Sequence, residues 1–403
     1  MFRRSTALAG PLALALGLAG ACGGHTTQDP TTSASASLTA NQAGPKDEIP
    51  PVAAAPAPVE PTAEPIPEPI PEPELSAIDA GDLRPLTKDE RARFLAGDDD
   101  PLAPTEIHYV KSNEIRHDVW FPYLADRGGA YVGVASDQNY TLIAASRANL
   151  VFLMDIDQRV VDLHQIYGLL LAVSEDAETL VNLFESGQSS AAVAILEGAL
   201  ADADPGKRKR IVRSYKASRE TVYRNLVKVL RRTRNGAPSS WLSNPEMYNH
   251  VRKLWMAGRV RTMGGDLTGD NTLHTVGKVA ADLAIPIRVL YLSNAEEYFR
   301  YVPSYVANIK ALGGDARSIV LRTIYSKDWV HADALWGYQV QSLPDFQARL
   351  GDSKNRSRNP MMRLAEKDGS LQRTTSVSGL SLLAIPEPGS AAKAPTMPPS
   401  TDN

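Results

Sequence analysis

AYVGVA at 130–135 and LVFLMDI at 150–156 decide the fold of this chain. Each is a short apolar run that ends in polar residues, which is typical of a strand buried on both faces of a sheet. Similar runs recur at 260–263, 287–292 and 318–324, and the intervening patterns predict helices at 139–148, 160–173, 273–283 and 296–312. Strands that alternate with helices form parallel βαβ units. We therefore expect an α/β, Rossmann-like domain, a mostly parallel twisted sheet with helices on both faces.

The expected α/β domain spans residues 82–352. Within it, residues 175–258 have a mostly helical pattern and are too numerous for a loop in a compact domain. We expect a helical insertion there, covering one end of the sheet.

The composition limits the classes of function. The 403 residues carry 43 basic and 46 acidic side chains, a net charge of −3, which excludes a chain built wholly around nucleic-acid binding. The single cysteine excludes a disulfide scaffold and a thiolate metal cluster. The seven histidines show no HExxH motif, and Asp266 and Asp270 lack the other ligands of a calcium loop. No metal site is predicted.

The first 22 residues predict export. A basic pair at 3–4 precedes an apolar run at 7–19 that is shorter than a membrane span, the layout of a signal peptide over residues 1–21. The small residues 19–21 followed by Cys22 resemble the lipobox of bacterial lipoproteins, with alanine at position 19 where leucine is usual. The resemblance implies that Cys22 carries fatty acids such as palmitate and anchors the chain in a membrane. The alternative is an ordinary signal peptide followed by an incidental cysteine.

The regions flanking the α/β domain are expected to be disordered. Glycines at 23 and 24 follow the cysteine. By resemblance to lipoprotein sorting, they imply that the chain is located in the cell envelope, at the outer membrane. Residues 22–81 are rich in Thr, Ser and Ala and then in Pro, which predicts an extended stalk. A proline-rich ligand for a partner's groove is the alternative. Residues 353–403 are polar and then proline-rich, which predicts a disordered tail.

Polar and acidic residues follow the predicted strands. The carboxyl ends of parallel strands share one edge of the sheet, and ligands bind in the crevice outside that edge. The residues expected there are Gly133, Ser136, Asp137, Asn139, Asp155, Asp266, Ser293, Asn294, Glu296 and Tyr298.

These positions resemble class I S-adenosylmethionine-dependent methyltransferases over residues 130–170 and 260–325. The resemblance implies that the loop beginning at Gly133 lies against the cofactor and that Asp155 binds its ribose hydroxyls. It also implies that Asp266 faces the adenine amino group. A carboxylate accepts hydrogen bonds from ribose hydroxyls well. S-adenosylmethionine is therefore the expected cofactor.

The resemblance extends to the turn after the fourth strand. It implies that Ser293 and Asn294 lie near the sulfonium and the substrate, and the aromatic face of Tyr298 suits a cation. The phrases GVASDQN and YLSN also make the chain similar to an uncharacterised family of exported bacterial proteins with a methyltransferase-like core. By this resemblance, Asn113 and Glu114 lie at the same cleft.

The sequence departs from the methyltransferase pattern at its glycine loop. The pattern Gly-x-Gly-x-Gly is replaced by Gly133-Val-Ala135-Ser-Asp137, and Tyr131 stands where an acidic residue is expected. Glycine permits close approach of the backbone to a cofactor. Asp155, Asp266 and Asn139 could also serve only as helix caps.

Two functions follow from these patterns. In the first, the chain is an envelope lipoprotein whose domain has kept the fold for ligand binding and lost catalysis. In the alternative, it is an active S-adenosylmethionine-dependent transferase. The broken glycine loop and the predicted export favour the first, because the cofactor is made in the cytoplasm. The two acidic residues at strand ends favour the second.

Residues 207–234 are strongly basic. They hold 12 basic residues and one acid, and the remaining 31 basic and 45 acidic residues leave the rest of the chain at −14. Apolar residues at helical spacing predict one amphipathic helix. Its basic face could contact anionic lipid headgroups, or could merely be a solvated face that balances the acidic remainder. Because export is predicted, no nucleic-acid partner is expected.

Overall fold

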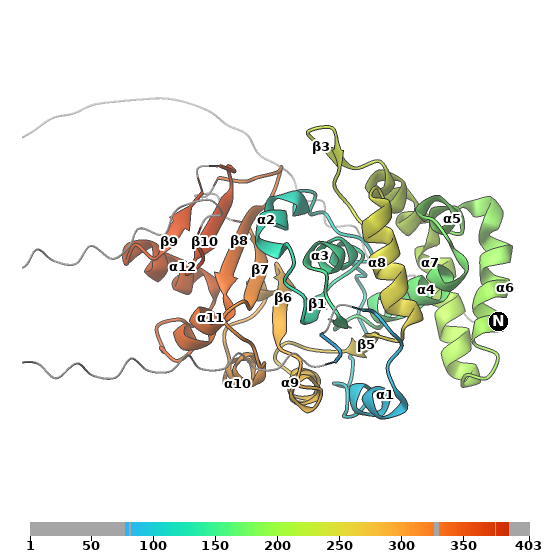
Figure 1. The fold of residues 1–403 in the computed structure, drawn as a ribbon, viewed down its shortest axis with the longest axis horizontal. Coiled ribbons are helices and arrows are strands. Elements are labelled where there is room, and N and C mark those ends of the chain that lie inside the picture. Colours follow the sequence, from blue (N-terminus) through green and yellow to red (C-terminus); the bar gives the residue numbers. More distant parts are fainter. Residues whose placement is uncertain (1–76, 80–81, 326–329, 375, 387–403) are drawn as a thin grey trace, which may run out of the picture. The chain divides into compact units, whose positions relative to one another are not determined.

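A computed structural model describes residues 77–79, 82–325, 330–374 and 376–386 (Figure 1). The predicted signal peptide, Cys22 and nearly all of the predicted stalk lie outside the described residues. Within the described ranges, no helix is long and apolar enough to cross a membrane.

One eight-stranded sheet organises the domain, in the order β5-β2-β1-β6-β7-β8-β10-β9. The strands are β1 Ala130–Val134, β2 Leu150–Asp155, β5 Val260–Gly264, β6 Ile287–Ser293, β7 Ile319–Ile324, β8 Gly337–Ser342, β9 Leu371–Arg373 and β10 Leu380–Leu383. The first five are parallel to one another, whereas β8 runs antiparallel to β7. The predicted Rossmann-like α/β fold with a mostly parallel sheet is confirmed.

Helices cover both faces of the sheet (Figure 1). One face packs against α2 Phe121–Leu124, α3 Gln138–Ser146, α4 Gln158–Val173 and α8 Pro245–Met256. The other packs against α1 Lys88–Phe94, α9 Thr272–Asp282, α10 Pro303–Ala311, α11 Leu343–Arg349 and α12 Arg358–Lys367. Consecutive strand residues point to opposite faces, so Tyr131 joins one core and Val132 the other. This is why the strands read as continuous apolar runs.

The stretch 175–258 is largely helical. It contains α5 Ala177–Asn182, α6 Ser189–Ala199, α7 Pro205–Leu230 and α8, together with a short hairpin of β3 Thr233–Arg234 and β4 Ala237–Pro238 that the sequence pattern did not suggest. The helices α6 and α7 pack on α4 and on each other, and α5 packs on α7.

The expected helix over 296–312 is divided. A short 3-10 turn, Ala295–Glu297, follows β6, and α10 begins only at Pro303. Proline has no backbone N–H and is favoured in the first turn of a helix, so the helix starts there and does not run through it. Two further 3-10 turns occur at His117–Trp120 and Ser186–Gln188.

Both expected boundaries of the folded domain are wrong. Ile78 and Asp79, assigned to the stalk, are buried, and Asp79 pairs with Arg288 at 3.1 Å. On the other side, α12, β9 and β10 lie within the expected tail, and β10 pairs with β8 in the main sheet. Although this segment is polar in composition, it forms the amphipathic helix α12, whose Met361 and Met362 are buried in the core.

Candidate functional site

The strand order places the crevice expected of this fold between β1 and β6. Connections leave β1 toward β2 and β6 toward β7, in opposite directions, so the sheet has a topological switch point between β1 and β6. Ligands of open α/β sheets bind outside the carboxyl ends of the strands at such a point. The loop after β1 and the residues at the end of β6 therefore define the first candidate site.

A segment of the chain itself crosses this edge of the sheet. We call residues 98–117 the strap. Asp99 accepts a hydrogen bond from Gly264 N at the end of β5 at 3.1 Å, and His108 Nδ1 lies 2.8 Å from Asp157 Oδ2 beyond β2. The carbonyl of Val110 accepts from Ser136 Oγ after β1 at 3.0 Å. The strap thus contacts the carboxyl ends of three neighbouring strands before it reaches β6.

Glu114 fills the switch point. Its side chain is 2% exposed and accepts hydrogen bonds from Tyr291 Oη at 2.7 Å, Ser293 Oγ at 2.6 Å and Thr323 Oγ1 at 2.9 Å. His117 Nε2 lies 3.4 Å from the other side of the carboxylate. The sequence predicted Glu114 near Ser293, and the two are in direct contact. The Glu114 carboxylate and the Ser293 hydroxyl satisfy each other's hydrogen-bonding capacity. A buried carboxylate is stable only when it has such partners.

Asp155 occupies the predicted place at the end of β2, but the backbone already uses both of its oxygens. Ala135 N donates to Oδ2 at 3.0 Å and Asp157 N to Oδ1 at 2.8 Å. Burial raises the pKa of Asp155 to about 6, against the effect of these amides. The carboxylate holds the loop after β1 and the turn after β2 in place.

Gly133 is required by packing inside the protein. A Cβ at this position would meet Asn139 Oδ1 at 2.0 Å and the Tyr131 ring at 2.6 Å. Asn139, fully buried, accepts from Tyr131 Oη at 2.8 Å and donates to the carbonyls of Val134 and Ser136. The predicted close approach at Gly133 is therefore made by Asn139 of the same chain.

The remaining predicted loop residues, Asp137 and Asp266, are both hydrogen-bonded within the protein. Asp137 is buried and accepts from Asn225 Nδ2 of α7 at 2.9 Å, and burial raises the pKa of its carboxyl. Asp266 is exposed, and its Oδ1 accepts from the backbone and hydroxyl of Thr268 in its own turn. Asp266 is not brought to the switch point, because it follows β5, the edge strand of the sheet, and β2 and β1 lie between the two places.

The last four predicted residues differ in burial and in position. Glu296 is buried at the wall of a separate cavity, with its carboxylate 2.6 Å from Arg322 and accepting from Tyr305 Oη at 3.0 Å. Asn113 is exposed on the strap. Asn294 and Tyr298 are joined by a 3.4 Å hydrogen bond at the edge of the same cavity.

These contacts test whether S-adenosylmethionine fits the switch point. Each oxygen of Asp155 already accepts a backbone amide, and Ser293 is hydrogen-bonded to Glu114. The strap crosses just beyond β1 and β2, at the edge of the sheet where ligands of this fold bind. In this structure the residues do not fit the cofactor.

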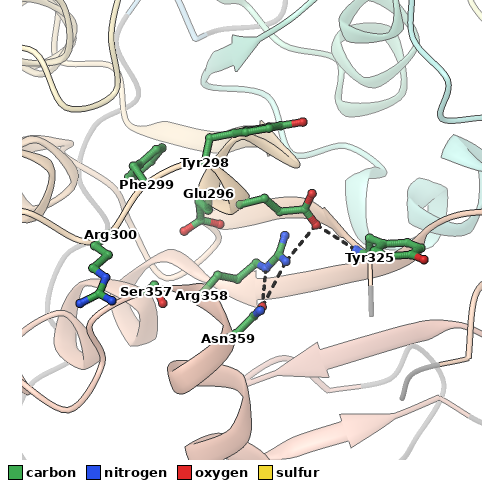
Figure 2. Close-up of a pocket in the computed structure, with 9 residues that line it drawn as sticks. Glu296, Tyr298, Phe299, Arg300, Tyr325, Ser357, Arg358 and Asn359 are labelled. Atoms are coloured by element: carbon green, nitrogen blue, oxygen red, sulfur yellow. Dashed lines mark hydrogen bonds and ion pairs between the residues drawn. The ribbon is translucent and has the colours of Figure 1, made fainter. Parts of the chain in front are cut away.

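An open cavity lies beyond the ends of β6 and β7 (Figure 2). We call it the Tyr298–Arg358 cavity. Its volume is about 490 Å³, and its lining comprises Glu296, Glu297, Tyr298, Phe299, Arg300, Tyr325, Ser357, Arg358 and Asn359. Tyr298 and Tyr325 are 75% and 45% exposed, so both offer aromatic surface to the cavity.

The charges in this cavity are mostly paired. Arg358 donates to Glu297 Oε1 at 3.0 Å and to the carbonyl of Thr323, and Tyr325 N donates to the same Glu297 oxygen (Figure 2). Arg300 makes no ion pair with any residue of the described ranges. The cavity therefore presents aromatic surface and one uncompensated cation.

Three of the nine lining residues of this cavity lie in a segment that the sequence pattern misjudged. Ser357, Arg358 and Asn359 belong to the start of α12, in the segment expected to be disordered. The apolar spacing of Met361, Met362 and Ala365 after a serine was the signal that could have located the helix.

No group of three or more His, Cys, Asp or Glu side chains in the described part of the chain is arranged to hold a metal ion. The His108–Asp157 pair lies at the same edge of the sheet, but Asp157 is also the cap of α4, accepting from Arg159 N at 2.9 Å. The pair holds the strap to the sheet.

Comparison with known proteins assigns the chain to a family but to no curated relative. No curated protein matches the chain significantly. The sequence model of a domain of unknown function, DUF7790, matches residues 109–384, which include the second half of the strap, the main sheet and α12. The match covers more than half of the chain, and the chain therefore belongs to the DUF7790 family.

Proposed function

We propose that this chain is a lipid-anchored protein of the cell envelope whose Rossmann-like domain binds a ligand without catalysing a reaction. The proposal rests chiefly on Glu114, which closes the switch point with three hydroxyl donors from β6 and β7. A methyltransferase-like site sealed by its own chain supports a derivative of the fold that has lost the cofactor.

The Tyr298–Arg358 cavity is the ligand site in this proposal. Glu297 pairs with Arg358 and Glu296 pairs with Arg322, so these four charges are neutralised within the protein. Arg300 then favours an anionic group, and the exposed tyrosine rings favour a planar one. The ligand class is therefore a small planar molecule that carries a carboxylate or a phosphate.

The alternative remains an active S-adenosylmethionine-dependent transferase. It is favoured by the position of Asp155 at the end of β2, and it requires the strap to leave the edge of the sheet. Calorimetric titration of the full chain with S-adenosylmethionine separates the two. We expect no saturable heat. Saturable heat that is lost in Asp155→Ala and kept in the control Asp202→Ala, an exposed aspartate, would overturn the non-catalytic proposal.

The ligand class is tested with phenyl phosphate, which combines a ring with an anion. We expect it to raise the thermal unfolding temperature of the full chain, and Arg300→Ala to remove the shift. The control is Lys354→Ala, which removes another exposed cation of the domain. An equal shift in both variants would exclude the Tyr298–Arg358 cavity as the site.

The anchor is tested separately. Cells that express the full chain are fed a fatty-acid analogue, and we expect label on the wild-type chain and none after Cys22→Ser. Label that persists in the variant would exclude lipidation at this cysteine.

A further inference from the structure

Helix α7 separates its residues sharply into a buried and an exposed face. It spans Pro205–Leu230, 26 residues, and its buried side is apolar, with Ile211, Tyr215, Val222 and Leu226 packed into the core. The buried side rests on α4, α5 and α6. The opposite side is exposed and carries the cations at 209, 213, 216, 224, 228 and, just past the helix end, 231.

Most of these cations have no acidic partner. In the described part of the chain, no ion pair or side-chain hydrogen bond involves Lys209, Arg213 or Lys216. Glu220 is the single acid of the helix, and it is shared by Arg224 at 2.8 Å and Arg219 at 3.3 Å. Ion pairs within the protein therefore neutralise only part of the positive charge on this face.

The geometry of the face is a straight row. At 1.5 Å per residue, the distance from position 209 to 231 is about 33 Å. The positions between the cations are held by small or polar residues such as Ala217 and Thr221, both exposed. The face offers no exposed aromatic or large aliphatic side chain that could insert into an apolar phase. Its attraction to a partner is therefore electrostatic.

We infer that the exposed face of α7 is a docking surface for anionic phospholipid headgroups, on which the domain lies without inserting. A row of mostly unpaired cations matches a plane of phosphates, and basic side chains near an anionic membrane each add to the attraction. Nucleic acid is the competing partner for such a row, and the predicted export signal argues against it. The inference goes beyond ligand binding in the Tyr298–Arg358 cavity and does not depend on it.

Vesicle sedimentation tests the inference with the full chain in a Cys22→Ser background, so that no acyl chain contributes. We expect binding to phosphatidylglycerol–phosphatidylcholine vesicles, none to pure phosphatidylcholine, and steep loss as salt shortens the Debye length below about 10 Å. Changing Lys209, Arg213 and Lys216 together to Gln should weaken binding by about a hundredfold, since each contributes roughly fivefold.

The matched control changes Lys88, Lys354 and Lys367 to Gln, which removes the same charge from other exposed positions. We expect the control to bind within about twofold of the parent. Equal loss in both triple variants would assign the effect to net charge and overturn the inference. Tighter binding to a DNA duplex than to vesicles at equal phosphate concentration would overturn it in favour of nucleic acid. Circular dichroism of each variant establishes that α7 is folded.

Discussion

Two regions of the same sheet edge have opposite character. At the ends of β1 and β6 the strap fills the crevice, and Glu114 is 2% exposed among hydroxyl donors. One strand further along, at the ends of β6 and β7, the Tyr298–Arg358 cavity is open and Tyr298 is 75% exposed. In the first region the polar side chains hydrogen-bond to one another within the protein. In the second region, side-chain surface remains exposed. The switch point, where open α/β sheets bind their ligands, is therefore distinct from the Tyr298–Arg358 cavity, which has room for one.

The largest expected effect comes from opening the sealed region. Glu114→Ala leaves the hydroxyls of Tyr291, Ser293 and Thr323 buried without their acceptor, and each unsatisfied group costs about 1–3 kcal/mol. We expect the free energy of unfolding to fall by about 4 kcal/mol, measured by urea denaturation. The control is Glu106→Ala, on an exposed part of the strap, which should change it by less than about 0.5 kcal/mol. Similar small losses in both variants would show that the crevice is not sealed by Glu114.

The next effect depends on pH. Asp155 has a pKa of about 6 in the folded chain and an ordinary value of 3.8. Between these values the folded state binds more protons than the unfolded state, so the free energy of unfolding falls as pH rises through this window. Asp155→Asn has no proton to lose and lacks this slope. Between pH 4 and pH 7, the free energy of unfolding of Asp155→Asn should therefore rise by about 2 kcal/mol relative to that of the wild type.

Urea denaturation at several pH values measures this difference. The exposed Asp202→Asn serves as the control, and its difference from wild type should stay nearly constant with pH. A constant difference for Asp155→Asn as well would mean that the carboxylate is solvated and open to a ligand, which would remove the contrast between the two regions.

The smallest effects come from deleting the same hydroxyl in each region. Tyr291 donates to Glu114 at 2.7 Å inside the sealed region, so Tyr291→Phe should cost about 1–2 kcal/mol of unfolding free energy. Tyr298 is at the open cavity, and Tyr298→Phe should cost less than about 0.5 kcal/mol. Thermal and urea unfolding of the two variants measure the contrast. Equal costs would show that Tyr298 is also part of a packed network.

The sequence placed most elements correctly but misjudged what the polar residues do. The strands that hold Gly133, Asp155 and Ser293 were identified from apolar runs, and all three residues lie at the predicted strand ends. Their roles as cofactor ligands came from resemblance. Whether a carboxylate at a strand end faces a ligand or a backbone amide depends on the next loop, and the sequence pattern of Asp155 is the same in both cases.

Distant parts of the chain explain the remaining errors. Glu114 meets Ser293 across 179 residues and Thr323 across 209. Arg358 reaches Glu297 across 61 residues, from a segment whose polar composition predicted disorder. No local periodicity carries information about such pairs.

The sequence by itself determined the five parallel strands β1, β2, β5, β6 and β7, the strand–helix alternation and the basic face of α7. These follow from the repeat distances of apolar and charged side chains along one segment, which are local properties. The tertiary structure alone decided that the strap seals the switch point, that α12 and β10 complete the domain, and that a cavity opens beside Tyr298. These depend on which segments meet in space, because a buried polar group is satisfied by whichever partner the fold brings to it.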